Sequence, residues 1–548
     1  MSTRGGREPS GGKTSTRGHT EARAPSAARA GGVGPGPALQ AALAFVVALA
    51  FYASLAAPSV LFGDSGELQT VALRGGIPHS SGYPSFVLIG RLFGLVPFAD
   101  RAYRITFMGA CFSAATVALL PLLLAELGLS RGAALAGALA LGASFTFWQV
   151  ALRAEVYSFA IFLGFMAVWR TLAALRGQAL RDALMAGVLC GLAVTGHLML
   201  APVAAVLGLV LALHVVRTQP RRILALAALL AAFAAGLTPF LYLVWADTQD
   251  YPFNYLRLVS QIQMPNGPTP DFDTPWKRVA WLVTSRGLYP SFPYPFSLRT
   301  TVGGVARCLA ELFLFELGPV APPFILWGFL RVRRAHPTAA LVLAGVAAAT
   351  LLFSGAIAPG THMGIFLLAC TLVCAIFIAA GIEPLIARGA GPAALAIALL
   401  VVPPHAIRIR ANDHPIGRWR LQTVQEDPTL GPERLPNLRG FHAPREYGEQ
   451  ALATIPRDAL VFAEWSEFAN LRYFQIVEHR RPELTLQTMS SKNLLVRMQR
   501  WQESHGIERA PFVFLSRPPA EAHASAPLDS IRLAVGRWIW IRRAPISD

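Results

Sequence analysis

Residues 61–84 read LFGDSGELQTVALRGGIPHSSGYP and directly follow the first long apolar run of the chain. This stretch places the carboxylates of Asp64 and Glu67 three residues apart, with His79 and Tyr83 shortly after them. Carboxylates at positions i and i+3 share one face of a helix. Two acids and an imidazole that emerge from a bilayer can carry proton or metal chemistry. The stretch is therefore the first candidate for a functional site.

A purely structural interpretation of the same stretch is equally open. Asp64 can cap a helix that starts at Ser65, with Glu67 reaching back to it as in a capping box. The run HSSGYP, residues 79–84, is then no more than a turn. The rest of the chain has to decide between a site and a helix cap.

The composition is that of a polytopic membrane protein. Of the 548 residues, 54% are hydrophobic and only 14% are charged, whereas charged residues make up roughly a quarter of an ordinary soluble protein. The net charge is +17, and the arginines lie in short clusters between apolar runs, which is how a membrane protein marks its cytoplasmic loops. The expected partner of this surface is the lipid bilayer, and nucleic acid is not expected to bind.

The N-terminal segment fixes the orientation of the predicted spans. Residues 1–36 are mostly Gly, Ser, Ala and Arg, which predicts a disordered basic tail. A basic tail stays in the cytoplasm by the positive-inside rule. The apolar run 38–58 begins too late to follow the n-region of a cleaved signal peptide, so we interpret it as a retained first span. Its far end, and Asp64 with it, then faces the outside.

We predict eleven spans within a membrane domain that covers residues 37–407, since each span needs about 20 apolar residues. One division can be made in two ways, because Pro202 could separate two spans or kink one long helix over 183–216. The predicted spans are residues 38–58, 104–127, 132–149, 156–175, 183–200, 201–216, 222–245, 307–330, 338–357, 363–383 and 390–407.

The arginine clusters decide between the two divisions. If each of eleven spans crosses once, every cluster falls on the side of the basic tail, as the positive-inside rule requires. With a single span over 183–216, the later clusters would lie outside, so two spans are preferred. The clusters are Arg170, Arg176 and Arg181; Arg217, Arg221 and Arg222; Arg331, Arg333 and Arg334; and Arg388.

The same count places the polar loops on the outer side of the membrane. The loops 59–103 and 246–306 and the turn at 153–157 all reach that side, while the span interiors are almost entirely Ala, Leu, Val and Gly. A channel or pump would carry ionisable groups through the bilayer midplane. Transport of a lipid or sugar is therefore the weaker hypothesis.

Residues 408–548 differ from the rest of the chain in their high charge content. Their pattern predicts a soluble α/β domain with helices near 444–454, 466–478 and 491–504 and strands in ALVFAEW, ELTLQT, PFVFLS and RWIWIRR. An odd number of spans places this domain outside, which is the periplasm in a bacterium. It contains no Gly-rich phosphate loop and no nucleophile elbow. We therefore assign it to acceptor binding or to support of the site.

Four motifs together carry a family resemblance. They are the run GDSGELQTVALRGGIPHSSGYPSFVLIGRLFGLVPF, the run SFTFWQVALRAEVYS, the pair Gly196-His197 and the run REYGEQALATIPRDALVF. In this order, over most of residues 38–480, they resemble the glycosyltransferase-C superfamily of multi-span membrane proteins. Within it they are similar to bacterial relatives of the eukaryotic protein O-mannosyltransferase that acts on plexin-type domains.

The resemblance implies an inverting glycosyltransferase in the bacterial inner membrane that uses a sugar on a polyprenyl phosphate as donor. The catalytic acidic motif of that superfamily falls on Asp64 and Glu67, the His-containing turn on 79–84, and a Glu-Val-Tyr motif on 155–157. Relatives have His-Pro-Pro-Gly where this chain has His-Ser-Ser-Gly, which keeps the imidazole. The arginine expected soon after Tyr242 is absent.

The chemistry of the transfer suggests a role for each residue. A hydroxyl acceptor must lose its proton during attack, and Asp64 is the candidate base. The departing phosphate needs fixed positive charge. The residues assigned to the donor and its phosphate are His79, Tyr83, Arg153, Glu155, Tyr157, His197, Arg257 and Arg286.

Simpler roles stay open for several of these residues. Arg153 and Glu155 can form an interfacial ion pair, Glu67 can be an ordinary helix acid, and His197 can be a core histidine with its hydrogen bonds satisfied. The Asp64 and Glu67 carboxylates suit Mg²⁺ or Mn²⁺, but they leave most of an octahedron to water and phosphate. No tightly held metal or other cofactor is expected.

The expected function is transfer of a sugar, mannose in the protein-directed branch of the resemblance, to a protein hydroxyl on the external face. An alternative with the same donor chemistry is transfer to a glycan or lipid of the cell envelope.

Overall fold

The computed structural model describes residues 36–263, 272–286, 297–357, 363–411, 436–489, 494–505, 511–519 and 528–542. These residues form a large helical region followed by a region that contains a five-stranded sheet. Apart from Gly36, the predicted basic tail lies outside the described residues.

Eight helices among the described residues are long and apolar enough to cross a membrane, and two bent pairs bring the number to ten. The polytopic helical fold predicted from the composition is thereby confirmed. The eight are α1 (Pro37–Leu55), α4 (Arg101–Glu126), α7 (Val156–Gly177), η1 with α9 (Leu198–Leu200 and Ala201–Thr218), α10 with α11 (Arg222–Leu237 and Phe240–Thr248), α16 (Pro337–Ile357), α18 (Leu368–Ala387) and α19 (Ala390–Ala411).

The predicted division of 183–216 into two helices is confirmed. The first is α8 (Leu180–Gly196), a helix of 17 residues that ends at the extended backbone of His197. The second is α9, which packs against α8. Pro202 lies in the first turn of α9, where a proline sacrifices no helical hydrogen bond.

The predicted span 132–149 is present as two helices and not as one. It consists of α5 (Arg131–Gly142) and α6 (Phe145–Ala151), which are bent by 71°. At the break, the hydroxyl of Ser144 donates to the carbonyl of Leu141, and such a local bond competes with continuation of the helix.

The predicted span 307–330 is also divided between two bent segments. In its place, α14 (Leu298–Ala310) and the π-helical turn η4 (Glu311–Glu316) are followed by α15 (Ala321–Ala335) at an angle of 103°. Between them Gly318 has a φ of +85°, and a proline lies in the first turn of α15. A proline has no N–H to continue a preceding helix, so the chain turns here.

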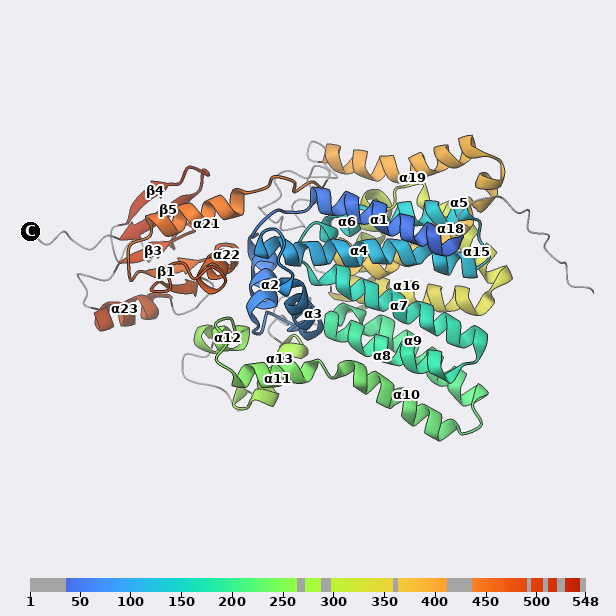
Figure 1. Ribbon diagram of the computed structural model, residues 1–548, viewed down its shortest axis with the longest axis horizontal. Helices are drawn as coiled ribbons and strands as arrows, with labels where there is room; N and C mark the ends of the chain where they lie inside the picture. Colours follow the sequence, from blue (N-terminus) through green and yellow to red (C-terminus); the bar gives the residue numbers. More distant parts are fainter. Residues whose placement is uncertain are drawn as a thin grey trace, which may run out of the picture. The chain divides into compact units, whose positions relative to one another are not determined.

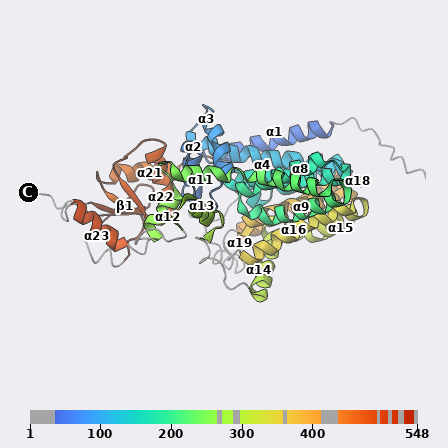
Figure 2. The same cartoon turned by 90° about the horizontal axis from the view of Figure 1, so that it is seen from below.

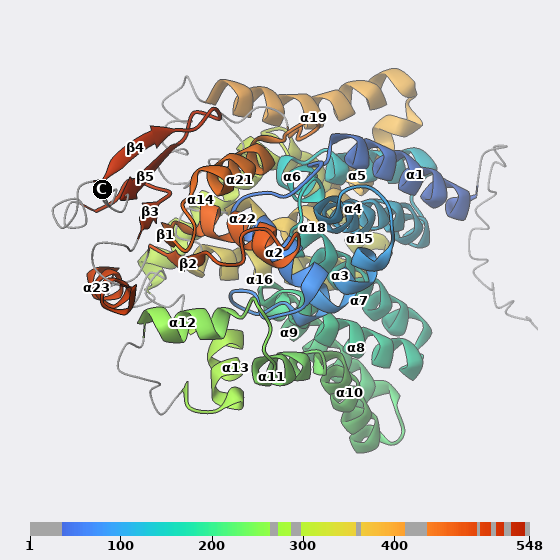
Figure 3. The same ribbon diagram turned by 60° about the vertical axis from the view of Figure 1, so that its left-hand side comes forward.

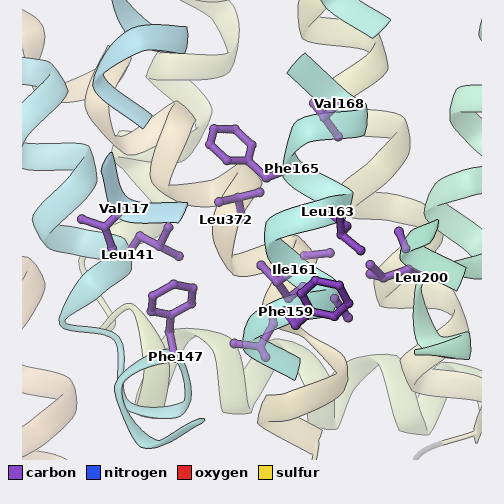
Figure 4. Packing of buried hydrophobic residues seen from close by; sticks show 14 of the residues in the cluster. Val117, Leu141, Phe147, Phe159, Ile161, Leu163, Phe165, Val168, Leu200 and Leu372 are labelled. Carbon is purple, nitrogen blue, oxygen red and sulfur yellow. The ribbon is translucent and has the colours of Figure 1, made fainter. Parts of the chain in front are cut away.

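The core of the helical region is apolar. Side chains from α4, α5, α6, α7, η1 and α18 meet in one buried cluster (Figure 4). The closest helix neighbours include α7 with α8 and α1 with α4, which run side by side in Figure 1. Likewise, α9 packs against both α8 and α16, and Figure 2 shows these helices together. In a bilayer, such packing relies on close contact between small and large apolar side chains.

Polar contacts connect the ends of these helices in two groups. The first group contains two arginines of the predicted cytoplasmic clusters: Arg176 pairs with Glu126, and Arg170 pairs with Asp182. Two hydrogen bonds belong to the same group, from Gln219 to the carbonyl of Gln178 and from Ser130 to Glu383. The second group contains residues of the loop 61–84: Ser65 donates a hydrogen bond to Glu155, Tyr83 stacks on His197, and Tyr242 donates a hydrogen bond to Gly76. A hydrogen bond between His405 and the carbonyl of Ala143 belongs to the same group of helix ends. The two groups lie at opposite ends of α7, α8 and α9.

Short helices follow the spans at the end that carries the acidic loop. The loop 59–103 forms α2 (Gly63–Arg74) and α3 (Pro84–Leu95), and the described part of 246–306 contributes α12 (Tyr255–Gln263) and α13 (Pro275–Val283). A bridge between Ile77 and Asn254 joins the two loops. A further short helix, α17 (Met363–Phe366), precedes α18.

The C-terminal region is built on a sheet with the strand order β2-β1-β3-β5-β4 (Figure 3). Strands β1, β2 and β3 are parallel, while β5 is antiparallel to both β3 and β4. The helices α21 and α22 cover one face and α23 covers the other. The bounds are α21 (Ala443–Thr454), β1 (Leu460–Ala463), α22 (Trp465–Ile476), β2 (Thr485–Thr488), α23 (Leu494–His505), β3 (Phe512–Phe514), β4 (Asp529–Arg532) and β5 (Trp538–Arg542).

Every helix and strand predicted for this region from the sequence is present, and β4 was not predicted. Because β4 is short, polar and mostly exposed, its sequence lacks the apolar alternation that marks a half-buried strand.

Candidate functional site

The helix α2 carries the two acidic residues of the opening stretch. It begins at Gly63, its N-cap is Phe62, and no side chain caps it. The capping interpretation is therefore wrong, because Asp64 lies inside the first turn and Glu67 bonds elsewhere. A carboxylate in the first turn still interacts favourably with the helix dipole.

Glu67 and His79 form a buried pair. The Glu67 side chain has no exposed surface and that of His79 is 21% exposed. One oxygen of Glu67 accepts the backbone N–H of His79 at 2.8 Å, and the other contacts the Nδ1 of its ring. Glu67 thus fixes both the turn and the orientation of the imidazole, and it is not an ordinary helix acid at the surface.

The charges around His79 keep a proton on its ring. Burial alone would lower the pKa of His79, but the carboxylates of Glu67, Asp64 and Glu155 raise it to about 10. Burial raises the pKa of Glu67, while its contact with His79 opposes that change. We assign the proton to His79, because three carboxylates act on that ring.

Asp64 is the accessible member of the cluster. Its side chain is 49% exposed, and Oδ2 lies 3.6 Å from the Nε2 of His79. Oδ1 accepts a hydrogen bond from the indole N–H of Trp465 at 2.7 Å. Asp64 therefore combines an exposed carboxylate with a fixed orientation.

The turn 79–84 positions Tyr83 behind the imidazole. The N–H of Gly82 donates to the carbonyl of His79 at 2.7 Å. Gly82 has a φ of +81°, and a Cβ there would lie 2.7 Å from a methyl carbon of Leu243, so the turn requires glycine. The hydroxyl of Tyr83 lies 3.2 Å from the Nε2 of His79.

The turn before α7 contributes to the same site. Glu155, which precedes α7, accepts a hydrogen bond from the hydroxyl of Ser65 at 2.8 Å. The ring of His197 lies between Tyr83 and Tyr157, with centroid distances of 5.2 and 5.0 Å. The Nδ1 of His197 accepts the backbone N–H of Met199. Glu155, Tyr157 and His197 are thus connected to the acidic helix.

Three arginines assigned to the phosphate differ in their surroundings. Arg153 is buried in the turn between α6 and α7. Arg257 pairs with Asp250 and with the carbonyl of Gln249. Arg286 is exposed just after α13. Among the contacts of the described residues, none joins Arg257 or Arg286 to the acidic cluster, and Arg257 is paired with Asp250 instead.

Two aromatic residues of the site were missed by the sequence analysis. Trp465 contacts Asp64 and lies with its ring centroid 6.2 Å from that of His79, and Tyr255 lies 6.3 Å from His79. Trp465 follows Asp64 by 401 residues, so no spacing rule connects them. The only sequence signal is its place at the end of the strand-like run ALVFAEW.

Tyr242 has a structural role. Its hydroxyl lies 3.1 Å from the backbone nitrogen of Gly76 and 3.2 Å from the carbonyl oxygen of the same residue. Tyr242 therefore connects α11 to the turn after α2. In relatives, an arginine is expected soon after the corresponding tyrosine.

Three side chains that could bind a metal ion lie together, and they also contact one another. Atoms of Asp64, Glu67 and His79 lie within 4.8 Å of one another. Both oxygens of Glu67 also contact His79, and the neighbouring carboxylates raise the pKa of His79.

Fold and site together define a class: a multi-span helical membrane protein with an acid–histidine site in the loop after its first span. Residues 64–222 match the family described as the Protein O-mannosyl-transferase TMEM260 N-terminal domain. The match confirms the resemblance over residues 64–222, and this part of the chain contains Asp64, Glu67, His79, Glu155 and His197.

Comparisons with individual proteins give further similarities. The chain is 29% identical over 187 residues to the mouse (Mus musculus) Protein O-mannosyl-transferase TMEM260. That match covers 33% of this chain and 26% of the mouse protein. The chain is also similar to crystal structures of ArnT from Cupriavidus metallidurans, bound to undecaprenyl phosphate and in the apo state. Both are 12% identical, cover 93% of this chain and 98% of ArnT, and have TM-scores of 0.35 and 0.32.

Proposed function

We propose that this protein is a membrane glycosyltransferase that moves a sugar, mannose in the first instance, from a polyprenyl phosphate to a hydroxyl acceptor. The observation that carries the proposal is the Asp64–Glu67–His79 cluster, which lies within the residues that match the O-mannosyl-transferase domain. The cluster combines an exposed carboxylate with a buried, charge-stabilised imidazolium.

The proposed reaction is a single displacement with inversion at the anomeric carbon. The acceptor oxygen attacks that carbon, a glycosidic bond forms, and the bond from carbon to phosphate oxygen breaks. Asp64 takes the proton of the hydroxyl, because its carboxylate is the exposed one. His79 supplies positive charge to the departing polyprenyl phosphate, and Glu67 holds that ring in place.

The surroundings of the cluster suit a lipid-linked donor. A polyprenyl chain dissolves in the bilayer and brings its phosphate to the interface, so the site has to lie at the end of apolar helices. Glu155, which precedes the span α7, and His197, which precedes the span formed by η1 and α9, both contact the acidic loop. We assign Tyr83, Tyr157 and His197 to the donor side of the site.

The proposal is tested with the purified full-length protein in detergent. We expect transfer of radiolabelled mannose from a polyprenyl-phosphate donor to a serine- or threonine-containing acceptor protein, because transfer needs no membrane compartments. A glycan acceptor and a lipid acceptor form parallel arms. If only the glycan or only the lipid were labelled, that molecule and not a protein would be the acceptor. Movement of intact donor across vesicle membranes without any transfer would favour a transporter.

We further propose that the site and residues 408–548 face the outside of a bacterial inner membrane, with the N-terminus in the cytoplasm. The two groups of polar helix ends support this, because the arginine pairs and the acidic loop lie at opposite ends of α7 and α8. A periplasmic reporter such as alkaline phosphatase, fused after Asp548, is expected to be active. Activity of a fusion that works only in the cytoplasm would contradict this topology.

We expect transfer to proceed without a tightly bound metal. His79 is already charged and paired with Glu67, so the leaving phosphate has a cation from the protein itself. Dialysis against EDTA should leave the rate within about twofold of the untreated enzyme, since no metal-bound water is needed for attack. Loss of activity that Mg²⁺ or Mn²⁺ restores would show that the acidic cluster holds an ion.

A further inference from the structure

The carboxylate proposed as the base is held from a distant part of the chain. The indole N–H of Trp465, the first residue of α22, donates to Oδ1 of Asp64 at 2.7 Å. The Asp64 side chain is 49% exposed, and a short carboxylate at the surface would otherwise rotate freely. The bond fixes one oxygen and leaves Oδ2 on the side of His79.

Trp465 is itself held in place by aromatic contacts. Its ring stacks on Phe468 with a centroid distance of 5.8 Å and an interplanar angle of 24°. The ring of Tyr255 meets it edge-on at 5.9 Å, and that of His79 does so at 6.2 Å. Aromatic pairs in these geometries are favourable, so the indole has little freedom to move away from Asp64.

The backbones that carry the two residues are also fixed to each other. The helices α2 and α22 are close neighbours, and a Cβ at Gly66 would lie 2.5 Å from the carbonyl oxygen of Leu61 and 3.6 Å from the backbone of Ala469. The side-chain amide of Asn470 donates to the carbonyl of Leu61 at 3.2 Å. The contact between Trp465 and Asp64 therefore belongs to a packed interface.

We infer that Trp465 is a positioning residue for Asp64, and that α22 completes the active site which α2 begins. This inference rests on the proposed function, because orientation of a carboxylate matters for rate only if that carboxylate removes a proton. A base held within hydrogen-bond reach of the acceptor gains from a fixed direction. The C-terminal region is thus part of the catalytic apparatus and not only a support.

The substitution Trp465→Phe tests this role, because it keeps an aromatic ring beside Phe468 while removing the N–H donor together with part of the indole. We expect kcat to fall about tenfold, with the KM values for donor and acceptor within about twofold of wild type. The matched control is Trp538→Phe in β5, a tryptophan that is 46% exposed on the same sheet region. This control should keep both constants.

Two kinetic results would overturn the inference. Unchanged kcat in Trp465→Phe would show that the bond does not matter for the reaction. An increase in KM at normal kcat would show that Trp465 contacts a substrate instead.

A stability measurement separates this inference from the proposed function. The thermal midpoints of Trp465→Phe, Asp64→Ala and the double variant form a cycle that requires no activity. If the side chains interact as described, the double variant should shift the midpoint no further than the more damaging single variant does. Additive shifts would overturn the inference even in an active enzyme. If the midpoints show that Trp465 and Asp64 interact but the protein transfers no sugar, the proposed function is rejected and the contact between the two residues stands.

Discussion

The substitution Asp64→Asn is expected to lower the rate of sugar transfer by about 10²- to 10⁴-fold, which is the usual effect of losing a general base. Asparagine is nearly isosteric with aspartate, and its amide oxygen can still accept the indole N–H of Trp465 that Asp64 accepts at 2.7 Å. The protein should therefore insert, fold and bind donor normally. The rate is measured with labelled donor at equal amounts of purified protein.

The structure makes this a clean test, because Asp64 does not cap α2. A lost cap therefore cannot produce the effect. The matched control is Asp273→Asn, at an aspartate of similar exposure (47%) that pairs with Lys277 away from the cluster. It should keep the wild-type rate. Near-normal turnover of Asp64→Asn at unchanged expression would exclude Asp64 as the base.

The second large effect is expected for Glu67→Ala. The Glu67 side chain has no exposed surface and is bonded to both the backbone and the ring of His79. Its removal leaves the partly buried imidazolium of His79 without its closest partner, and breaking a buried pair costs about 3–5 kcal/mol of folding free energy. The thermal midpoint of the purified variant, compared with wild type in the same detergent, measures the loss.

An exposed acid provides the comparison for Glu67. Glu449 is 44% exposed and pairs with Arg445 and Arg480. For an ion pair of that exposure, solvent screening reduces the expected loss in Glu449→Ala to about 0.2–1 kcal/mol. Equal midpoint shifts in the two variants would show that the Glu67–His79 pair contributes no more than a surface contact.

The same pair predicts a pH dependence of stability. The pKa of His79 is raised from 6.5 to about 10 in the folded protein, so the folded state binds a proton that the unfolded state releases. The stabilisation is fully present below pH 6.5 and is lost as the pH rises towards 10. We expect the midpoint of wild type to fall more steeply between pH 7 and pH 10 than that of His79→Gln. Parallel curves for the two proteins would exclude a protonated His79.

The comparison of sequence with structure begins with the spans. The approximate positions of the spans and the division of 183–216 follow from the length of apolar runs and the spacing of arginines. The break itself lies at His197, a few residues before the predicted boundary between 200 and 201. The bends at Ser144 and Gly318 were not predicted. A hydropathy pattern records how apolar a stretch is, whereas a bend depends on local hydrogen bonds and on prolines in their context.

In the acidic site, too, the sequence predicted one part of the arrangement and only the structure revealed the rest. That Asp64, Glu67, His79 and Tyr83 lie close together was determined by the sequence, since they are separated by few residues in one loop between two helices. The helix-cap alternative, by contrast, could be rejected only from the backbone at Phe62 and Gly63.

The tertiary structure decided how distant residues join that loop, including Trp465, which the sequence did not indicate. Glu155, His197 and Trp465 reach the acidic helix from three other parts of the chain, and Arg257 turns to its own partner instead. Contacts between residues far apart in the chain depend on how whole helices pack, and one sequence carries no local pattern for that packing. The sequence thus indicated the apolar helices and the acidic loop 61–84, while the packing of α22 on α2 determined how the Asp64 carboxylate is held.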